Sequence, residues 1–311
     1  MSHNVESMAY VGETPWHGLG TIVPDGINPQ DLMVKAGLAW DAQLTPCYIR
    51  VNGELVETGR YASVRSTDGR ILSPAVSKNW KPVQNQQAFD FFMEFCAGGD
   101  MKMDTAGSLK NGQYVWALAR IQESFSLFKG KDVINGYLLF SNPHIAGRAI
   151  TVMFTPVRVV CNNTLTMALE GEATAGGRFR HLHTATFNAE EAKLALGLAK
   201  GQLSAFKETA KFLSSKKMTE QQATEYFQQL FPANEREASL LSERVGEVLE
   251  SQPGANLGAG TWWQGFNAVT YFLDHKIGRG QDTRLASAWY GWGRNKKDEA
   301  LQTAVKLANA A

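Results

Sequence analysis

The N-terminal architecture follows from the stretch YIRVNGELVETGRYASVR, which runs from Tyr48 to Arg65. Its apolar and polar residues alternate loosely, as in half-buried strands, and Asn52-Gly53 tolerates the positive φ angles that a tight hairpin turn requires. A second such dipeptide, Asp68-Gly69, separates this stretch from another strand-like run, Ile71 to Val76. The pattern predicts three strands between about residues 44 and 77.

A helix follows these strands, and the same order of elements then recurs. Ala88, Phe91, Phe92 and Phe95 fit one helical face, and Gly98-Gly99 ends the helix. Three further strands and a short helix are predicted at Leu109–Ile121, Ile134–Phe140, Ile150–Val160 and Leu165–Leu169. We therefore predict an α+β fold with two β-β-β-α-like units, although no residue-level repeat relates them.

The rest of the chain has helical patterns. A capping-box-like start at Asn188 precedes an apolar stripe from Ala192 to Leu213, which either packs on the chain's own sheet or forms a subunit seam. The remaining expected elements are helix starts at Thr219–Gln222 and Asn234–Glu237, a loop at Ser251–Gly260, and short helices at Trp262–Lys276 and Thr283–Trp292. The predicted organisation is a β-rich core of residues 1–187 and a helical region of residues 188–311 packed on it.

Composition narrows the class of protein. The 311 residues include 31 Lys and Arg against 30 Asp and Glu, so an anion-binding site must come from local clustering rather than from bulk charge. No apolar run approaches the roughly 20 residues of a membrane span, and Met1–Tyr10 lacks the pattern of a signal peptide. The three cysteines form no CxxC pair and no metal-ligand spacing with the histidines. We expect a cytoplasmic protein with reduced thiols.

Motifs of catalysis and nucleotide binding are missing from the sequence. It contains no P-loop, no dinucleotide-binding glycine pattern, no HExxH zinc motif and no GxSxG nucleophile elbow. Cys161 with His181 or His183 could assemble in three dimensions as a hydrolase site, but a lone cysteine at a helix start is more often a small buried apolar residue. We therefore expect no enzyme activity, no cofactor and no metal.

One basic cluster follows the third strand of the second unit. Its residues, Arg178-Phe179-Arg180-His181-Leu182-His183, alternate cations with an aromatic ring, and Arg148 and Arg158 precede it in the sequence. Guanidinium groups bind phosphates and a phenylalanine ring offers a stacking face, which suits single-stranded nucleic acid. The alternative is a solvated edge strand whose Phe179 and Leu182 point inward.

Two other basic stretches are candidates. The C-terminal stretch is opposed only by Asp282 within its span, and its cations are Lys276, Arg279, Arg284, Arg294, Lys296 and Lys297. Tryptophans at helical spacing, such as Trp262 and Trp289, are more often core residues, and lysines near a last helix usually face solvent. The smaller stretch is Lys78-Asn79-Trp80-Lys81, at a predicted strand-to-helix turn.

Several segments resemble phage- and plasmid-like proteins grouped in a widespread domain of unknown function. The segments are Tyr61–Arg65, Pro82–Phe89, Pro156–Leu165, Arg178–Thr184, Phe266–Thr270 with Asp274-His275, and Ser287–Gly291, so the resemblance covers about residues 10–305. It implies a mobile-element context, in a phage or plasmid of a bacterial host. In topology and in its missing nucleotide motifs, the chain is also similar to phage single-strand annealing proteins of the Red-beta, RecT and Erf type, which form rings or filaments.

These observations lead to a functional hypothesis. The chain is expected to bind single-stranded DNA without sequence preference and to anneal strands without ATP in recombination, as a homo-oligomer larger than a dimer and with a possible phage or host recombination partner. The residues expected to contact nucleic acid are Arg148, Arg158, Arg178, Phe179, Arg180, His181, Arg279, Arg284, Lys78, Trp80 and Lys81, of which Phe179 or Trp80 would stack on bases.

The alternative comes from a different class: a non-catalytic protein-binding factor, such as an inhibitor of host defence. Convergence of the basic clusters on one surface would favour DNA. An exposed apolar patch would favour a protein partner.

Overall fold

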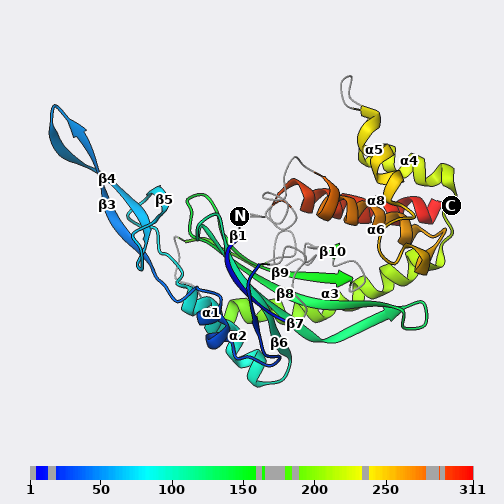
Figure 1. Ribbon diagram of the computed structural model, residues 1–311, viewed down its shortest axis with the longest axis horizontal. Coiled ribbons are helices and arrows are strands. Elements are labelled where there is room, and N and C mark those ends of the chain that lie inside the picture. Colours follow the sequence, from blue (N-terminus) through cyan, green and yellow to red (C-terminus); the bar gives the residue numbers. More distant parts are fainter. Residues whose placement is uncertain are drawn as a thin grey trace. The chain divides into compact units, whose positions relative to one another are not determined.

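The computed structural model of the chain (Figure 1) describes residues 5–12, 19–158, 163–164, 179–183, 189–232, 238–277, 287 and 291–310. Of residues 158, 163–164, 179–180, 189–200 and 238–240 it describes the backbone only. The predicted α+β class is confirmed, because two sheets make up the N-terminal half and helices make up the C-terminal part. Among the helices described, none has both the length and the hydrophobicity of a membrane span.

The first three predicted strands form a sheet of their own, in the order β3-β4-β5. They span Ala42–Val51, Glu54–Arg65 and Ile71–Val76. Asn52 (φ 49°) and Gly53 (φ 91°) connect β3 to β4 in the left-handed region, as the Asn-Gly dipeptide predicts. Helix α2 (Asn85–Ala97) follows, so the first β-β-β-α order is confirmed.

The other strands form a larger sheet. Its order is β10-β9-β8-β7-β6-β1-β2, and β11 pairs with β9 outside this path. β1 pairs antiparallel with β6 and parallel with β2. The strands are β1 (Val5–Val11), β2 (Thr21–Val23), β6 (Met101–Leu109), β7 (Tyr114–Leu127), β8 (Asp132–Pro143), β9 (Ile150–Arg158), β10 (Asn163–Thr164) and β11 (Phe179–His181).

Helix starts follow the capping chemistry of the sequence where the structure describes them. The Thr219 hydroxyl accepts a hydrogen bond from the backbone N–H of Gln222, whose side chain accepts one from the Thr219 N–H, as in a capping box. The further helices are α1 (Pro29–Lys35), α3 (Ala189–Ser215), α4 (Glu220–Leu230), α5 (Ala238–Val248), η2 (Ala255–Gly258), α6 (Trp262–Tyr271), η3 (Phe272–Lys276) and α8 (Trp292–Ala310). The helices predicted at Leu165–Leu169 and Thr283–Trp292, and the starts at Asn188 and Asn234, lie wholly or largely outside the described residues.

Contacts between Cα atoms divide the chain into two compact units. Unit 1 comprises residues 1–122, 138–153 and 170–197, and unit 2 comprises residues 123–137, 154–169 and 198–311. Both units contain strands as well as helices. The division therefore does not coincide with the boundary predicted after residue 187.

Aromatic side chains of α2 and β8 meet in the core of unit 1. Phe91 and Phe92 are buried, and their rings lie 5.5 Å and 6.2 Å from the ring of Phe140 in β8. The ring of Phe95 packs on Phe91 at 5.3 Å. The helical face predicted for this segment is thus the face that packs.

Tryptophans fill the core of unit 2. Trp262 and Trp263, at the start of α6, are almost fully buried. The ring of Trp262 lies 5.6 Å from that of Tyr226, and the indole N–H of Trp263 donates a 2.9 Å hydrogen bond to the Asp132 carboxylate. Trp262 is therefore a core residue, as predicted, whereas Trp289 lies outside the described residues.

The apolar stripe of α3 packs within unit 2 wherever its side chains are described. Leu203, Phe206 and Leu213 are buried, and the Phe206 ring lies 6.0 Å from Phe125 and 6.1 Å from Trp263. Of the two interpretations of the stripe, packing on the chain's own strands is the one that holds for these residues.

The strand predicted at Leu109–Ile121 begins too early, and a strand before it was missed. Asn111-Gly112 lies in the turn between β6 and β7 rather than inside a strand. The sequence of β6, MKMDTAGSL, alternates poorly because the register shifts between Met103 and Thr105. Gly107 also hides the strand, since a Cβ at that position would clash with the Ser7 carbonyl and the Trp116 ring.

Candidate nucleic-acid interface

Four connecting segments of unit 1 meet near one end of strands β6 to β9. They are the β6–β7 turn (residues 110–113), the β8–β9 loop (144–149), the β5–α2 connection (77–84) and the end of β11 (181–183). The backbone N–H of His144 donates a 2.8 Å hydrogen bond to the Gln113 carbonyl, which joins the first two segments. The N–H of Lys81 donates to the His183 carbonyl, which joins the last two. β11 pairs with β9 at His181 and Ile150, directly after the β8–β9 loop.

Four exposed cations project from these segments, which contain no Asp or Glu. We call the set the cationic end; it consists of Lys78, Lys81, Lys110 and Arg148. The smaller predicted stretch, Lys78 to Lys81, and Arg148 are therefore brought to the same part of unit 1. Lys110 was missed, because the sequence interpretation placed it at the start of a strand instead of in a turn.

Two predicted contact residues at this end are buried. The Trp80 side chain is 7% exposed, and its ring packs on the imidazole of His183 with 4.7 Å between the ring centres. His181 is also 7% exposed. Stacking of a base on Trp80 and a phosphate contact by His181 do not fit this conformation, because neither side chain offers a free face.

A pair of buried histidines lies beneath the cationic end. His144 Nε2 is 2.9 Å from Asn85 Oδ1, and the Asn85 side-chain NH2 group donates to the backbone carbonyls of Leu38 and Trp40. Asn85 Oδ1 can only accept, so His144 Nε2 carries the proton in this arrangement. Burial, together with the smaller effect of the neighbouring His183, lowers the pKa of His144 to about 3.

His183 is neutral at this site for the same physical reason. Burial lowers its pKa, although hydrogen bonds with the backbone of Lys81 and Pro143 oppose that effect. Both rings therefore act as uncharged packing groups and add nothing to the positive charge above them. Among the described residues, no group of three or more His, Cys, Asp or Glu side chains is placed to hold a metal ion.

The other predicted site residues divide between the two units and the undescribed segments. Phe179 and Arg180 lie in β11, opposite Val152 and Thr151, and Arg158 is the last residue of β9; only their backbones are described. Arg178, Arg279, Arg284 and Cys161 lie outside the described residues.

The C-terminal basic stretch has a structural role where the structure describes it. Lys297 is fully buried, and its Nζ lies 2.8 Å from the Asp274 carboxylate. Lys296 donates to the Leu230 carbonyl at 2.9 Å and pairs with Glu299 at 2.7 Å. The expectation that both lysines face solvent is wrong, because the bonds to Leu230 and Asp274 attach α8 to neighbouring elements of unit 2.

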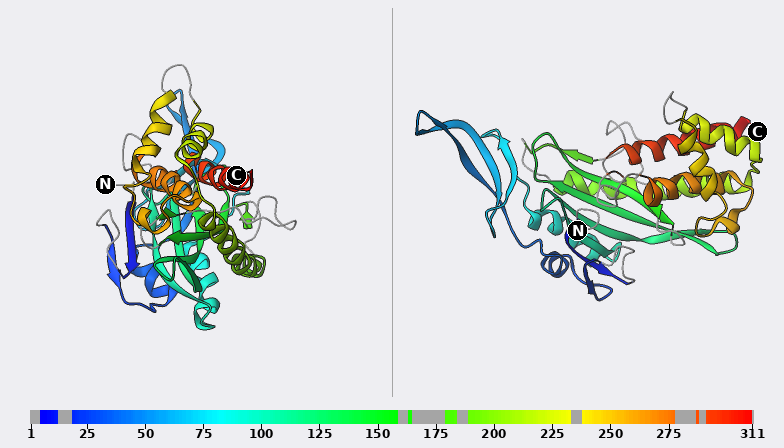
Figure 2. Two further views of the ribbon diagram at one scale, coloured as in Figure 1. Left: turned by 90° about the vertical axis from the view of Figure 1, so that its right-hand side faces the viewer. Right: turned by 45° about the horizontal axis from the view of Figure 1, so that its top comes forward.

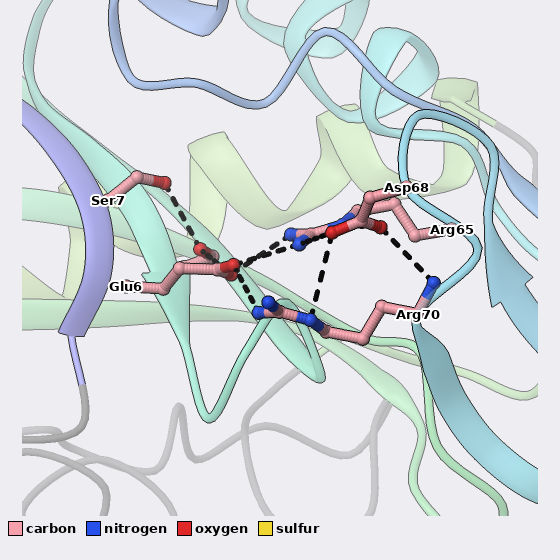
Figure 3. A network of polar contacts seen from close by, with 6 residues as sticks. Glu6, Ser7, Arg65, Asp68 and Arg70 are labelled. Carbon is pink, nitrogen blue, oxygen red and sulfur yellow. Dashed lines mark hydrogen bonds and ion pairs between the residues drawn. The ribbon is translucent and has the colours of Figure 1, made fainter.

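A second group of charges in unit 1 is compensated (Figure 3). Arg65, at the end of β4, pairs with Glu6 of β1 at 2.9 Å and with Asp68 at 2.5 Å, and Arg70 pairs with Glu6 at 2.8 Å. The Ser108 hydroxyl donates to the other oxygen of Glu6. The paired guanidinium holds the pKa of Asp68 well below its usual range. These charges cancel, so the network fixes structure and contributes no net charge to this part of unit 1.

Comparison with known proteins identifies a family. Residues 74–309 match the model of a domain of unknown function, DUF932. Neither a curated protein nor a solved structure matches the chain.

Proposed function

Since the chain belongs to the DUF932 family, whose function is unknown, we propose a function from its own surface: binding of single-stranded DNA without sequence preference, and annealing of strands without a nucleotide cofactor by an assembly of several copies. The proposal includes the mobile-element context, in a phage or plasmid of a bacterial host. The observation that supports it is the cationic end, whose four segments carry the exposed Lys78, Lys81, Lys110 and Arg148 and contain no Asp or Glu in their own sequence.

Charge is the physical basis of the proposal. The whole chain carries a net charge of only +1, so four local cations create a field that bulk charge does not. Each phosphate that a cation neutralises releases condensed counterions, which favours binding and makes it depend on salt. Lysines on flexible stems suit an irregular, single-stranded backbone.

The form of the cationic end favours a single strand over a duplex. Its four segments are turns, loops and a strand end, whereas proteins that read duplex DNA insert a helix or a two-stranded ribbon into the major groove. Phosphate contacts from loops carry no sequence information, which agrees with binding that ignores sequence. Arg178, Phe179 and Arg180, next to His181, remain proposed contacts. Arg158 remains a proposed phosphate contact, and Arg279 and Arg284 remain proposed second-line contacts.

Titration of labelled oligonucleotides across salt concentrations tests the proposal. For the wild-type chain, affinity for single strands should exceed affinity for duplexes. Replacing Lys78, Lys81, Lys110 and Arg148 with Gln should flatten the plot of log affinity against log salt by about 2 to 3 units, at roughly 0.7 per lost contact. A wild-type chain without affinity for any oligonucleotide at about 50 mM salt would overturn the proposal.

A matched variant controls for the loss of charge. Lys35, Lys129, Lys131 and Lys217 are exposed lysines outside the cationic end. Replacing these four with Gln removes the same charge and should leave the salt dependence nearly unchanged. Annealing of complementary strands, followed by fluorescence without nucleotide, should fail in the first variant and persist in the second.

A second candidate function has its own observation. The small sheet exposes apolar side chains, including Ile49, Leu55 and Val56, as a protein-binding factor would. If the wild-type chain binds no oligonucleotide and remains a monomer, a non-catalytic protein-binding factor, such as an inhibitor of host defence, becomes the favoured function.

A further inference from the structure

The tip of the β3–β4 hairpin is exposed along its whole length. Every residue from 48 to 60 is exposed, and we call this segment the arm. Figures 1 and 2 show it extending beyond β5, the third strand of the same sheet. Its exposed apolar side chains are Tyr48 (54%), Ile49 (54%), Val51 (44%), Leu55 (65%) and Val56 (45%).

Neither face of the arm is covered within the described part of the chain. Ile49 pairs with Val56 and Val51 with Glu54, so these four side chains share one face. The other face carries the pairs Tyr48–Glu57 and Arg50–Leu55. A two-stranded ribbon that is open on both faces is marginally stable in water, and it gains stability when further strands join it.

Both edges of the arm are also open among the described residues. β3 is an outer strand of its sheet, and β5 pairs with β4 only from Tyr61 to Val64. Residues 54–60 of β4 therefore have β3 on one side and no strand on the other. Strand edges with unpaired N–H and C=O groups are templates for pairing with another chain.

The charges on the two edges are opposite. Arg50 is the only charged residue of β3, whereas the free segment of β4 carries Glu54, Glu57 and Arg60. The arm is neutral overall, so neither a nucleic acid nor an anionic membrane surface complements it as a whole. The β3 edge of one arm does complement the β4 edge of another arm.

We propose that the arm joins copies of this chain, with β3 of one copy pairing antiparallel with the free edge of β4 in the next copy. Continuation of the sheet keeps the two faces in register, so Arg50 of one copy lies on the same face as Glu57 of the next and pairs with it. Two different edges meet, so the contact is head-to-tail and repeats until a ring closes or a filament grows. The inference rests on the part of the proposed function that has several copies assembling, and it specifies the interface.

Charge reversal with mixing tests the proposal. In Arg50→Glu, each contact between copies sets the introduced carboxylate against that of Glu57. In Glu57→Arg, each contact sets the introduced guanidinium against that of Arg50. Each variant should sediment as a monomer at micromolar concentration, whereas the wild-type chain should form species larger than a dimer. An equimolar mixture of the two variants should regain assembly, because contacts between unlike variants join opposite charges, and such rescue cannot come from repair within one hairpin.

Each other outcome overturns the proposal. Wild-type chain that stays monomeric, single variants that assemble like the wild type, or a mixture that remains monomeric would exclude this head-to-tail contact. Circular dichroism and melting of each variant check that unit 1 is folded. A triple variant with Ile49, Val51 and Val56 replaced by Thr, which keeps β-branched side chains but removes apolar surface, should also lose assembly.

These measurements are made without DNA, so they separate this inference from the function proposed above. If the single variants are monomers that still bind oligonucleotides with the wild-type salt slope, the arm is an assembly interface and the cationic end binds DNA independently. If assembly is unaffected but the oligonucleotide affinity of the variants falls, the arm contacts DNA and the assembly proposal fails.

Discussion

The base and the arm of the β3–β4 hairpin are parts of the same two strands in opposite surroundings. At the base, Ala42, Ala62 and Ser63 are buried, and Arg65 is held by two carboxylates (Figure 3). In the arm, every residue from 48 to 60 is exposed. Strand pairing is continuous through both apart from a bulge that sets residues 58–60 of β4 opposite Cys47, so pairing alone does not determine where a strand is stable. The two parts differ in whether other parts of the chain cover their side chains.

The base is stabilised by contacts with distant parts of unit 1. The Arg65 guanidinium lies 5.5 Å from the centre of the Trp40 ring, and the Trp40 ring lies 5.0 Å from the imidazole of His144. Ion pair, indole and imidazole thus form one buried stack. The arm has no comparable contact among the described residues, so its substitutions should affect the stability of a single chain little.

Replacement of Arg65 should give the largest difference in the free energy of unfolding between a variant of the base and a variant of the arm. Arg65→Ala removes two hydrogen bonds from the half-buried Glu6, which keeps the Arg70 ion pair and the Ser108 hydrogen bond. Loss of one partner of a buried pair costs about 3 to 5 kcal/mol, and the retained partners place the expected loss at the lower end of that range. Arg60→Ala, in the arm, should change the free energy of unfolding by less than about 0.5 kcal/mol. Denaturant titration of both variants measures the difference. Similar losses would mean that the arm is anchored as firmly as the base.

Lowering the pH should have the second-largest effect, by destabilising the buried stack of Arg65, Trp40 and His144. The pKa of His144 is about 3 in the folded chain, whereas its ordinary value is 6.5. Below pH 6.5 the unfolded chain therefore binds a proton at this residue that the folded chain does not bind. The free energy of unfolding should fall by about 1.4 kcal/mol per pH unit from this residue as the pH drops below 6.5, and His183 acts in the same direction.

His144→Gln isolates that contribution. The variant should show a pH dependence reduced by about 1.4 kcal/mol per unit in the same range, whatever its stability at neutral pH. Denaturant titrations at several pH values provide the slope. An unchanged slope would show that His144 is charged in the folded chain.

Replacement of two glycines should have the smallest effect on stability, and it compares the arm with the base most directly. Gly53 in the arm and Gly69 in the β4–β5 turn, next to the base, both have positive φ, 91° and 70°, with open space where a Cβ would lie. Replacement by Ala costs about 1 to 2 kcal/mol of backbone strain at either site. Gly69→Ala should lower the global free energy of unfolding by that amount.

Gly53→Ala should instead act locally. Hydrogen exchange of the arm amides should accelerate about 5- to 30-fold, the equivalent of 1 to 2 kcal/mol, while the denaturation midpoint stays nearly constant. A shift of the midpoint as large as that of Gly69→Ala would contradict the independence of the arm.

Local chemistry made much of the fold predictable. Asn52-Gly53 predicts the hairpin, Thr219 with Gln222 predicts a helix start, and the spacing of Phe91 and Phe95 predicts a packed helix face. β6 could not be found in this way, because its bulge and Gly107 are required by β1 and β7, which are distant in the sequence. Prediction from sequence patterns uses only residues that lie near one another along the chain.

The candidate site was predictable only in part, for a similar reason. Lys78, Lys81 and Arg148 stand out as cations in the sequence, but their proximity depends on loops that meet across the sheet. Trp80 looks the same in sequence whether it stacks on a base or on His183, and burial decides between the two. Lys297 was misread because its partner Asp274 belongs to another element.

The pairing of β1 with β6 also determines the order in which parts of unit 1 can form during synthesis. Val5 pairs with Leu109, about a hundred residues later, so on a ribosome β1 waits roughly 5 to 20 s for its partner. The β3–β4 hairpin closes around a two-residue turn and can form in about 1 to 10 μs once it emerges. The arm is therefore complete on the nascent chain well before its base is anchored, and chains growing on one polysome present arms to each other before release.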